Sequence, residues 1–121
     1  MTKSKGLIIE DNEDLALIFS EALQASGFET LTLGDGQEWL DYLQDNKPDV
    51  VILDLHLPNV SGVDILAHIR SDERLADIRV VVATADPQLA EVIEEQSDLV
   101  LQKPVSFNQL RDLAGRLAPR S

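Results

Sequence analysis

Five polar residues of this chain each follow a short apolar run and carry groups suited to phosphate chemistry. Glu10 and Asp11 come after the first run, Asp54 after the third, Thr84 after the fourth and Lys103 shortly after the fifth. A carboxylate at the end of an apolar strand is costly to desolvate unless water reaches it or charged partners hold it. The pattern therefore raises the question of whether these five groups meet in the folded chain.

Three carboxylates within a few ångströms of one another would repel each other. A hard cation would relieve that repulsion, and Mg²⁺ suits this inventory because it accepts one or two carboxylates and leaves positions for water and phosphate oxygens. An ammonium and a hydroxyl close by would complete the needs of phosphoryl transfer. Because Asp54 ends the most apolar run, we expect its carboxylate to be the nucleophile that forms an acyl phosphate.

The segments that must position these groups alternate between strand-like and helix-like periods. Helical spacing of apolar residues follows each strand, and Gly34-Asp35-Gly36 is typical of a turn before the second helix. Asp86-Pro87 predicts the start of the fourth helix, and Ser106 with Gln109 has the spacing of a capping box for the fifth. Strands are predicted at 5–10, 28–33, 50–54, 78–83 and 99–101.

Each predicted helix carries an apolar stripe that should face the sheet. The residues assigned to these stripes include Ile18, Leu40, Val92, Phe107 and Ala114. Strands separated by helices pair in parallel through right-handed crossovers, and strands buried on both faces are near-continuous Val, Ile and Leu. We therefore expect residues 1–121 to form a single doubly wound α/β domain, with its ligand site beyond the carboxyl ends of the strands.

Composition narrows the classes of function. The net charge is −12, with 22 acidic against 10 basic residues, which opposes binding to nucleic acid. The chain has no cysteine, which excludes disulfides and thiolate metal sites. No apolar run approaches the ~20 residues of a membrane span, and the N-terminus lacks the apolar region of a signal peptide. We expect a cytoplasmic protein that is not inserted in a membrane.

Taken in order, these motifs resemble the receiver domain of two-component response regulators over essentially the whole chain. The likeness rests on Glu10-Asp11, on Asp54 with Leu-His-Leu-Pro and Gly62 after it, on Thr84-Ala85 and on Lys103-Pro104. Each motif is weak alone, but their joint occurrence at the ends of successive strands is highly specific. The resemblance implies a flavodoxin-like (βα)5 fold with strand order 2-1-3-4-5.

The resemblance also implies roles for the site residues. Asp54 would be the phosphoacceptor, and Thr84 and Lys103 would contact the phosphoryl group. Asp11, Asp54 and the backbone carbonyl of His56 would bind Mg²⁺ or Mn²⁺, with Glu10 helping through water. The Lys103-Pro104 peptide bond would be cis.

A sensor histidine kinase or a histidine phosphotransfer protein would supply the phosphoryl group. The response would be a changed surface on the fourth helix, fifth strand and fifth helix, read by a downstream protein. The expected chemistry is self-phosphorylation and self-dephosphorylation rather than enzyme turnover. We expect a single receiver domain over residues 1–121 without an output domain, and homodimerisation stays open.

One position departs from the family pattern. Receivers usually carry Tyr or Phe three residues before the lysine, and here that position is Val100. Phosphorylation should survive this change, but Val100 has no ring to make the rotation that follows phosphorylation in the family. His56 and Asp86, which lie two residues after Asp54 and Thr84, correspond to positions that set the lifetime of the phosphoryl group, and we expect Asp86 to bias the attacking water.

Other interpretations compete with this one. Val100 favours a receiver-like interaction module that binds its partner without phosphorylation. A flavodoxin-type cofactor binder would need a Gly/Ser/Thr-rich loop after the first strand, where this chain has acids instead. A hydrolase with an aspartyl phosphate intermediate would need a second aspartate two residues after Asp54, where His56 stands. Glu13 and Asp14 are best explained as favourable charges at a helix N-terminus.

Overall fold

Five strands and five α-helices alternate along the chain in the computed structural model, which describes residues 4–34 and 38–117, apart from the side chain of Ala114. Asp35 and Gly36 of the predicted turn lie outside the described residues. The elements are β1 (Ser4–Ile9), α1 (Glu13–Ala25), β2 (Phe28–Leu33), α2 (Trp39–Asp45), β3 (Val50–Asp54), α3 (Gly62–Ser71), β4 (Arg79–Thr84), α4 (Pro87–Ile93), the 3-10 turn η1 (Glu94–Gln96), β5 (Leu99–Gln102) and α5 (Phe107–Leu117).

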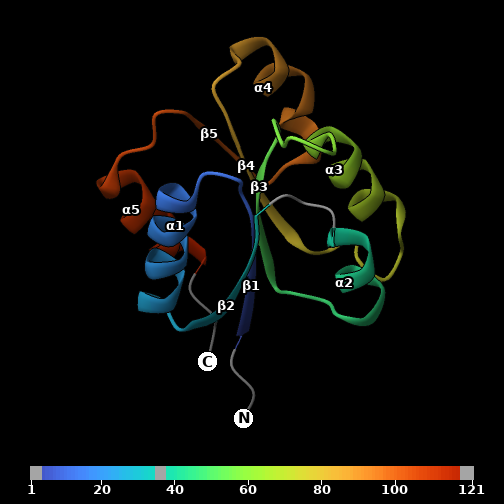
Figure 1. The fold of residues 1–121 in the computed structure, drawn as a ribbon, viewed down its shortest axis with the longest axis horizontal. Helices are drawn as coiled ribbons and strands as arrows, with labels where there is room; N and C mark the ends of the chain where they lie inside the picture. The colour runs from blue at the N-terminus through green and yellow to red at the C-terminus, as the bar shows by residue number, and fades with distance from the viewer. Residues whose placement is uncertain (1–3, 35–37, 118–121) are drawn as a thin grey trace.

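The five strands form one parallel sheet in the order β2-β1-β3-β4-β5, which confirms the predicted strand order. Helices α1 and α5 cover one face, and α2, α3 and α4 cover the other (Figure 1). The predicted strand boundaries are correct to within one residue. The shifts at β4 and β5 add Thr84 and Gln102 to the ends of these strands.

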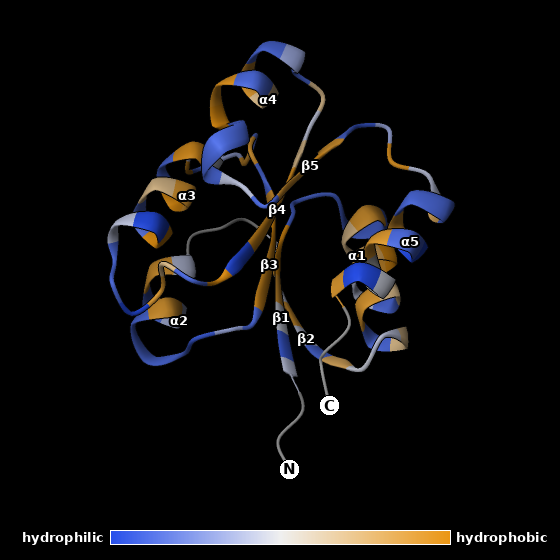
Figure 2. Cartoon of the chain, turned by 180° about the vertical axis from the view of Figure 1, so that it is seen from behind, coloured by the Kyte–Doolittle hydropathy of each residue, from blue (hydrophilic) through white to orange (hydrophobic). Residues whose placement is uncertain are grey.

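The core lies on both faces of the sheet, which explains why the central strands are so uniformly apolar. Figure 2 shows hydrophobic strands at the centre and helices whose hydrophilic sides face outward. Every residue of β3 is buried, and so is every residue of β4 after Arg79. Alternate residues therefore face opposite helical layers: Leu53 packs with α2 and α3, whereas Ile52 packs with α1 and α5.

The predicted apolar stripes are wrong at four positions, because the helices present a narrower face to the sheet than the pattern suggested. Ile18 and Leu40 are each 39% exposed, Phe107 is 67% exposed and Val92 is 75% exposed. Helix α4 has only seven residues and buries only Ile93 among them. A helix of two turns cannot turn every apolar side chain toward one layer.

Side-chain caps define the helix starts as the sequence predicted. Asp86 Oδ1 accepts hydrogen bonds from the backbone N–H groups of Gln88 and Leu89, at 3.0 and 3.2 Å. Ser106 and Gln109 form the reciprocal capping box. No helix within residues 4–34 and 38–117 has the length and apolar character needed to cross a membrane.

The Arg70 guanidinium at the end of α3 ties three segments together. It donates to the carbonyl oxygens of Gln96 in η1, at 2.6 Å, and of Ile78 before β4, also at 2.6 Å. It also forms an ion pair with Asp98 at 2.9 Å, just before β5. Because Asp98 in turn accepts from the Val80 backbone N–H at 2.7 Å, Arg70 fixes where η1 and the start of β5 sit against the sheet.

Gly62 allows the start of α3 to approach the end of β3. A Cβ atom at this position would lie 2.6 Å from the Leu55 Cα atom and would also overlap the Asp54 backbone carbonyl. Both neighbours are backbone atoms of the segment that carries Asp54, so they cannot give way as a flexible side chain could. Gly62 therefore sets the path of the loop beside the functional site.

We predict that Gly62→Ala lowers the free energy of unfolding by about 1–3 kcal/mol or more, as overpacking does. The matched control is Gly115→Ala in α5, where a Cβ atom would meet nothing within 4 Å. This control should gain about 0.5–1 kcal/mol because alanine favours the helix. Urea unfolding followed by circular dichroism measures both, and equal effects of the two substitutions would contradict the packing argument.

Candidate functional site

The register of the sheet brings the predicted residues together at one edge. Ile9 pairs with Leu53, so Glu10 and Asp54 follow side by side on neighbouring strands. Asp54 itself pairs with Ala83, which places Thr84 one residue further along. Thr84 then pairs with Gln102, the residue before Lys103. The carboxyl ends of four strands thus meet where the sequence predicted.

Lys103 joins two of the carboxylates. Its Nζ atom lies 2.9 Å from Glu10 Oε1 and 3.4 Å from Asp54 Oδ2. Glu10 is 1% exposed and Asp54 is 3% exposed, so water alone does not account for the stability of their charges. A lysine between two buried carboxylates supplies part of the compensating charge that this burial requires.

Burial and mutual repulsion change the ionisation of this group. Desolvation raises the pKa of Glu10 to about 7, and the Asp54 carboxylate acts in the same direction, whereas the Lys103 ammonium lowers it. Burial opposes the charged form of Lys103, but its pairing with Glu10 and Asp54 outweighs burial and raises the Lys103 pKa. The lysine therefore stays charged, and the carboxylates carry more negative charge than it neutralises.

The remaining charge imbalance fits a divalent cation. Glu10, Asp11 and Asp54 each offer one carboxylate oxygen, and these oxygens lie within 4.8 Å of one another. Glu10 Oε1 is buried and, apart from its ion pair with Lys103, has no aligned hydrogen-bond partner among the described residues. Asp11 is exposed, which leaves the cluster open on one side. All-oxygen donors of this kind are the ligands that Mg²⁺ and Mn²⁺ prefer.

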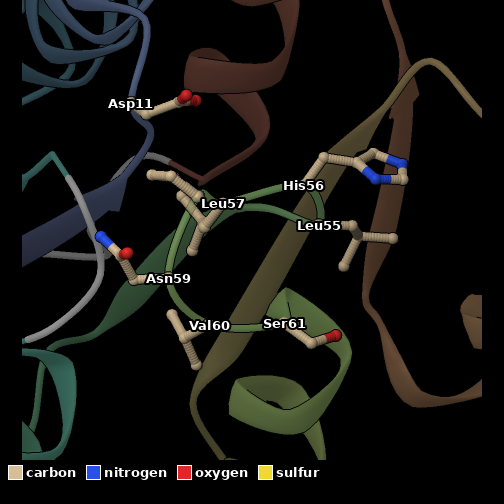
Figure 3. A pocket seen from close by; sticks show the side chains of 8 residues that line it. Asp11, Leu55, His56, Leu57, Asn59, Val60 and Ser61 are labelled. Atoms are coloured by element: carbon tan, nitrogen blue, oxygen red, sulfur yellow. The ribbon is translucent and has the colours of Figure 1, made fainter.

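The loop from Leu55 to Ser61 forms the open side of the site. It closes on itself through a bridge between His56 and Ser61, and the His56 backbone N–H donates to Asp54 Oδ1 at 3.0 Å. With Asp11, this loop lines an open hollow of about 550 Å³ (Figure 3). Asp11 belongs both to the lining of this hollow and to the carboxylate cluster, so the hollow lies beside the cluster. The metal-binding role expected of the His56 carbonyl stays a prediction.

Thr84 lies at the other side of the site and is fully buried. Its hydroxyl oxygen accepts a hydrogen bond from the Asp86 backbone N–H at 3.0 Å and lies 3.3 Å from His56 Nε2. The Thr84 backbone carbonyl accepts from the Lys103 N–H at 2.8 Å. Thr84 thus connects the loop after β3, the segment after β5 and the residue that caps α4.

Two contacts of the site were absent from the sequence interpretation. The first is the contact between the His56 ring and Thr84. The sequence interpretation gave His56 a metal-binding backbone carbonyl and a place among the positions that set the phosphoryl lifetime, but no contact with Thr84. The second is the hydrogen bond from the Asn12 N–H to Glu10 Oε2, at 3.2 Å. The spacing from Asp54 places His56 near the site, but no sequence signal gives the direction of its ring. The Lys103-Pro104 bond is cis, as the resemblance implied.

Comparison with known proteins agrees with this geometry. The model of the response regulator receiver domain family matches residues 7–114. The polar-differentiation response regulator DivK of Brucella ovis is 40% identical over 85 residues, which cover 70% of this chain and 68% of DivK. The similarity to DivK thus extends over about two thirds of both proteins.

Solved structures of response regulators are similar over nearly the whole chain. The phosphorylated cyanobacterial phytochrome response regulator RcpA is 27% identical, with a TM-score of 0.80, and the match covers 96% of this chain and 91% of RcpA. The Mn²⁺-bound form of the response regulator Rcp1 is 25% identical, also with a TM-score of 0.80, and the match covers 94% of this chain and 91% of Rcp1. The fold and the arrangement of the strands are shared.

The raised pKa of Glu10 predicts that the metal-free protein loses stability as the pH rises. Between the ordinary value of 4.5 and about 7, the folded state keeps a proton on Glu10 that the unfolded state has released. The protonated Glu10 carboxyl group therefore contributes its whole share to the free energy of unfolding below pH 4.5, and this contribution is lost above about pH 7. We expect a total change of at most about 3 kcal/mol.

Urea unfolding of wild type and Glu10→Gln in EDTA, from about pH 4.5 to 8, isolates this contribution from that of other carboxyl groups. The glutamine variant should gain stability relative to wild type as the pH rises through this range. Parallel stability curves for the two proteins would contradict the prediction.

Proposed function

The chain belongs to the response regulator receiver domain family, and on that premise we propose that it accepts a phosphoryl group on Asp54 and signals by a change in its surface. The observation that carries this proposal is the setting of the Asp54 carboxylate. It is buried at the end of β3, with Lys103 Nζ 3.4 Å from one oxygen and the other oxygen accepting from the His56 N–H. A carboxylate held in this way is oriented for attack on an incoming phosphorus atom.

The proposed step exchanges one bond of phosphorus for another. An Asp54 carboxylate oxygen forms the new P–O bond as the P–N bond to the donor's imidazole breaks, and the imidazole nitrogen leaves with the bonding pair. Lys103 then faces both the carboxylate and the transferred group, where its charge offsets that of the phosphoryl oxygens. Later attack by water on phosphorus returns the free carboxylate and releases inorganic phosphate.

Other residues of the site prepare this step. A divalent cation, Mg²⁺ or Mn²⁺, would neutralise charge on the phosphoryl oxygens when bound, and Glu10, Asp11 and Asp54 are the residues that would hold it. The buried Thr84 hydroxyl is the group that would donate to a phosphoryl oxygen. The Mn²⁺-bound form of Rcp1 supports the cation site, and the phosphorylated form of RcpA supports phosphorylation.

The proposed partners follow from the same chemistry. A sensor histidine kinase or a histidine phosphotransfer protein would donate the phosphoryl group, and a downstream protein would read the surface made by α4, β5 and α5. Exposed Val92 on α4 offers such a partner an apolar contact. The chain's own chemistry would be limited to gaining and losing this phosphoryl group, and we place its action in the cytoplasm.

A second candidate function has one observation in its favour. Val100 stands where receivers usually carry an aromatic ring, and its side chain packs against the core layer of α3 and α4. The chain could then bind its partner in one constitutive state. The ion pairs at Lys103 and the carboxylate cluster favour the phosphoacceptor instead, because a constitutive binding module has no need of such a cluster.

We predict that acetyl phosphate with Mg²⁺ adds one phosphate to the protein, measured by intact mass. Asp54→Asn should gain none, and omission of Mg²⁺ should abolish the gain in wild type. Mass gain in Asp54→Asn would identify another acceptor. If wild type gains no phosphate and beryllofluoride with Mg²⁺ leaves its amide NMR spectrum unchanged, the constitutive binding module becomes the better account.

We further predict that Mg²⁺ stabilises the wild-type protein, by about 2.7 kcal/mol at a concentration a hundred times Kd. Asp11→Asn should lose most of this gain, because it removes one of the three clustered carboxylates. Glu13→Gln is the matched control, since Glu13 is also an exposed acid but lies in the first turn of α1, outside the cluster. Thermal unfolding against Mg²⁺ concentration measures all three. Equal loss in both variants would point to general charge rather than to a defined site.

A further inference from the structure

The His56 ring is the part of the site that the proposed chemistry leaves without a role. It belongs to an exposed residue of the loop after β3, yet its Nε2 atom lies 3.3 Å from the buried Thr84 hydroxyl oxygen. In Figure 3 the ring points away from Asp11 and toward β4. The ring of an exposed residue thus lies within hydrogen-bond distance of a buried hydroxyl.

The hydroxyl of Thr84 has few ways to make its hydrogen bonds. A hydroxyl has one hydrogen to donate and two lone pairs that accept. One lone pair receives the Asp86 N–H at 3.0 Å. The side chain is fully buried, so the hydrogen must find a protein partner, and His56 Nε2 is the aromatic nitrogen within reach.

A phosphoryl group on Asp54 would offer that hydrogen a stronger acceptor. Asp54 pairs with Ala83, the residue before Thr84, so the two side chains belong to neighbouring strand ends. A hydrogen bond to a charged oxygen is roughly twice as strong as one between neutral groups. Since one hydrogen cannot serve both acceptors, the phosphoryl group and the imidazole compete for it.

On the basis of the proposed function, we propose that Thr84 donates to His56 Nε2 before phosphorylation and releases the ring when it turns to the phosphoryl group. His56 is thus a positioning residue that holds the Thr84 hydroxyl in the resting state. Val100 has no aromatic ring that could respond to phosphorylation. In this chain the released His56 imidazole would be an aromatic ring whose environment changes instead. Exposure of His56 leaves its ring free to move into solvent.

Histidine ring ¹⁵N NMR tests this proposal directly, because the chain has only two histidines and His68 serves as an internal reference. The His68 ring packs edge-on against Trp39, 5.0 Å between centroids, between α2 and α3. Spectra are compared in Mg²⁺ alone and in Mg²⁺ with beryllofluoride, at the same pH of about 8. We expect the His56 Nε2 signal to shift as its hydrogen bond is lost, while the His68 signals stay in place.

A shift of the His56 signal could come from loss of the Thr84 hydrogen bond or from the new charge nearby. Thr84→Val and Thr84→Ser distinguish these two causes. Thr84→Val, without a hydroxyl, should show the released His56 signal before beryllofluoride is added and little further change afterwards. Thr84→Ser keeps the hydroxyl and should behave as wild type does. An equal beryllofluoride shift of His56 in wild type and Thr84→Val would overturn the proposal, as would a resting Nε2 that carries its own hydrogen.

Failure of the inference is distinguishable from failure of the proposed function. If the amide signals of Asp54 and Lys103 respond to beryllofluoride but the His56 ring does not, the site accepts the phosphoryl mimic and only the inference is wrong. If neither responds, the phosphoacceptor function is wrong and the inference falls with it.

Affinity gives a second readout. Removing a competitor should strengthen binding of the phosphoryl mimic, so His56→Ala should bind beryllofluoride about two- to tenfold more tightly, the range set by one neutral hydrogen bond. Beryllofluoride binding is compared at saturating Mg²⁺, so that any change in Mg²⁺ affinity of this variant does not enter the comparison. His68→Ala is the matched control and should keep the wild-type affinity for beryllofluoride. Unchanged or weaker beryllofluoride binding in His56→Ala would overturn the proposal.

Discussion

The pairing of Lys103 with two buried carboxylates is the interaction on which this site depends. Parallel pairing brings Glu10 and Asp54 to adjacent strand ends, and burial would make two such charges costly without a cation between them. One lysine offsets only part of the negative charge of these two carboxylates, and the nearby Asp11 adds to the negative charge that stays uncompensated. This uncompensated negative charge destabilises the metal-free protein as the carboxylates ionise. It is also what would attract a divalent ion. Stability and function are therefore in tension at this edge of the sheet.

Much of this arrangement could be predicted from the sequence because the fold class itself determines it. Apolar strands separated by helices give a parallel sheet, and a parallel sheet brings the residues after its strands to one edge. Glu10, Asp54, Thr84 and Lys103 could thus be grouped without coordinates. Caps such as Asp86 were predictable for a similar reason, since the capping interaction involves residues close in sequence.

What could not be predicted depends on side-chain direction and on packing between distant segments. Val92 and Phe107 have the helical spacing of core residues, but the short α4 and the first turn of α5 leave them exposed. The rotation of the His56 ring toward Thr84 and the close approach of Gly62 to Leu55 are likewise set by the path of one loop. Spacing along the chain carries no information about such tertiary contacts.

Arg70 limits how a change at Thr84 could spread through the molecule. Helix α4 is joined to Thr84 at one end through Asp86, whereas η1, at its other end, is held by the bond from Arg70 to the Gln96 carbonyl. A segment that is held at one end and displaced at the other moves least near the held end. If Thr84 moves, the displacement of residues 87–96 should therefore be largest in the first turn of α4 and smallest near Gln96.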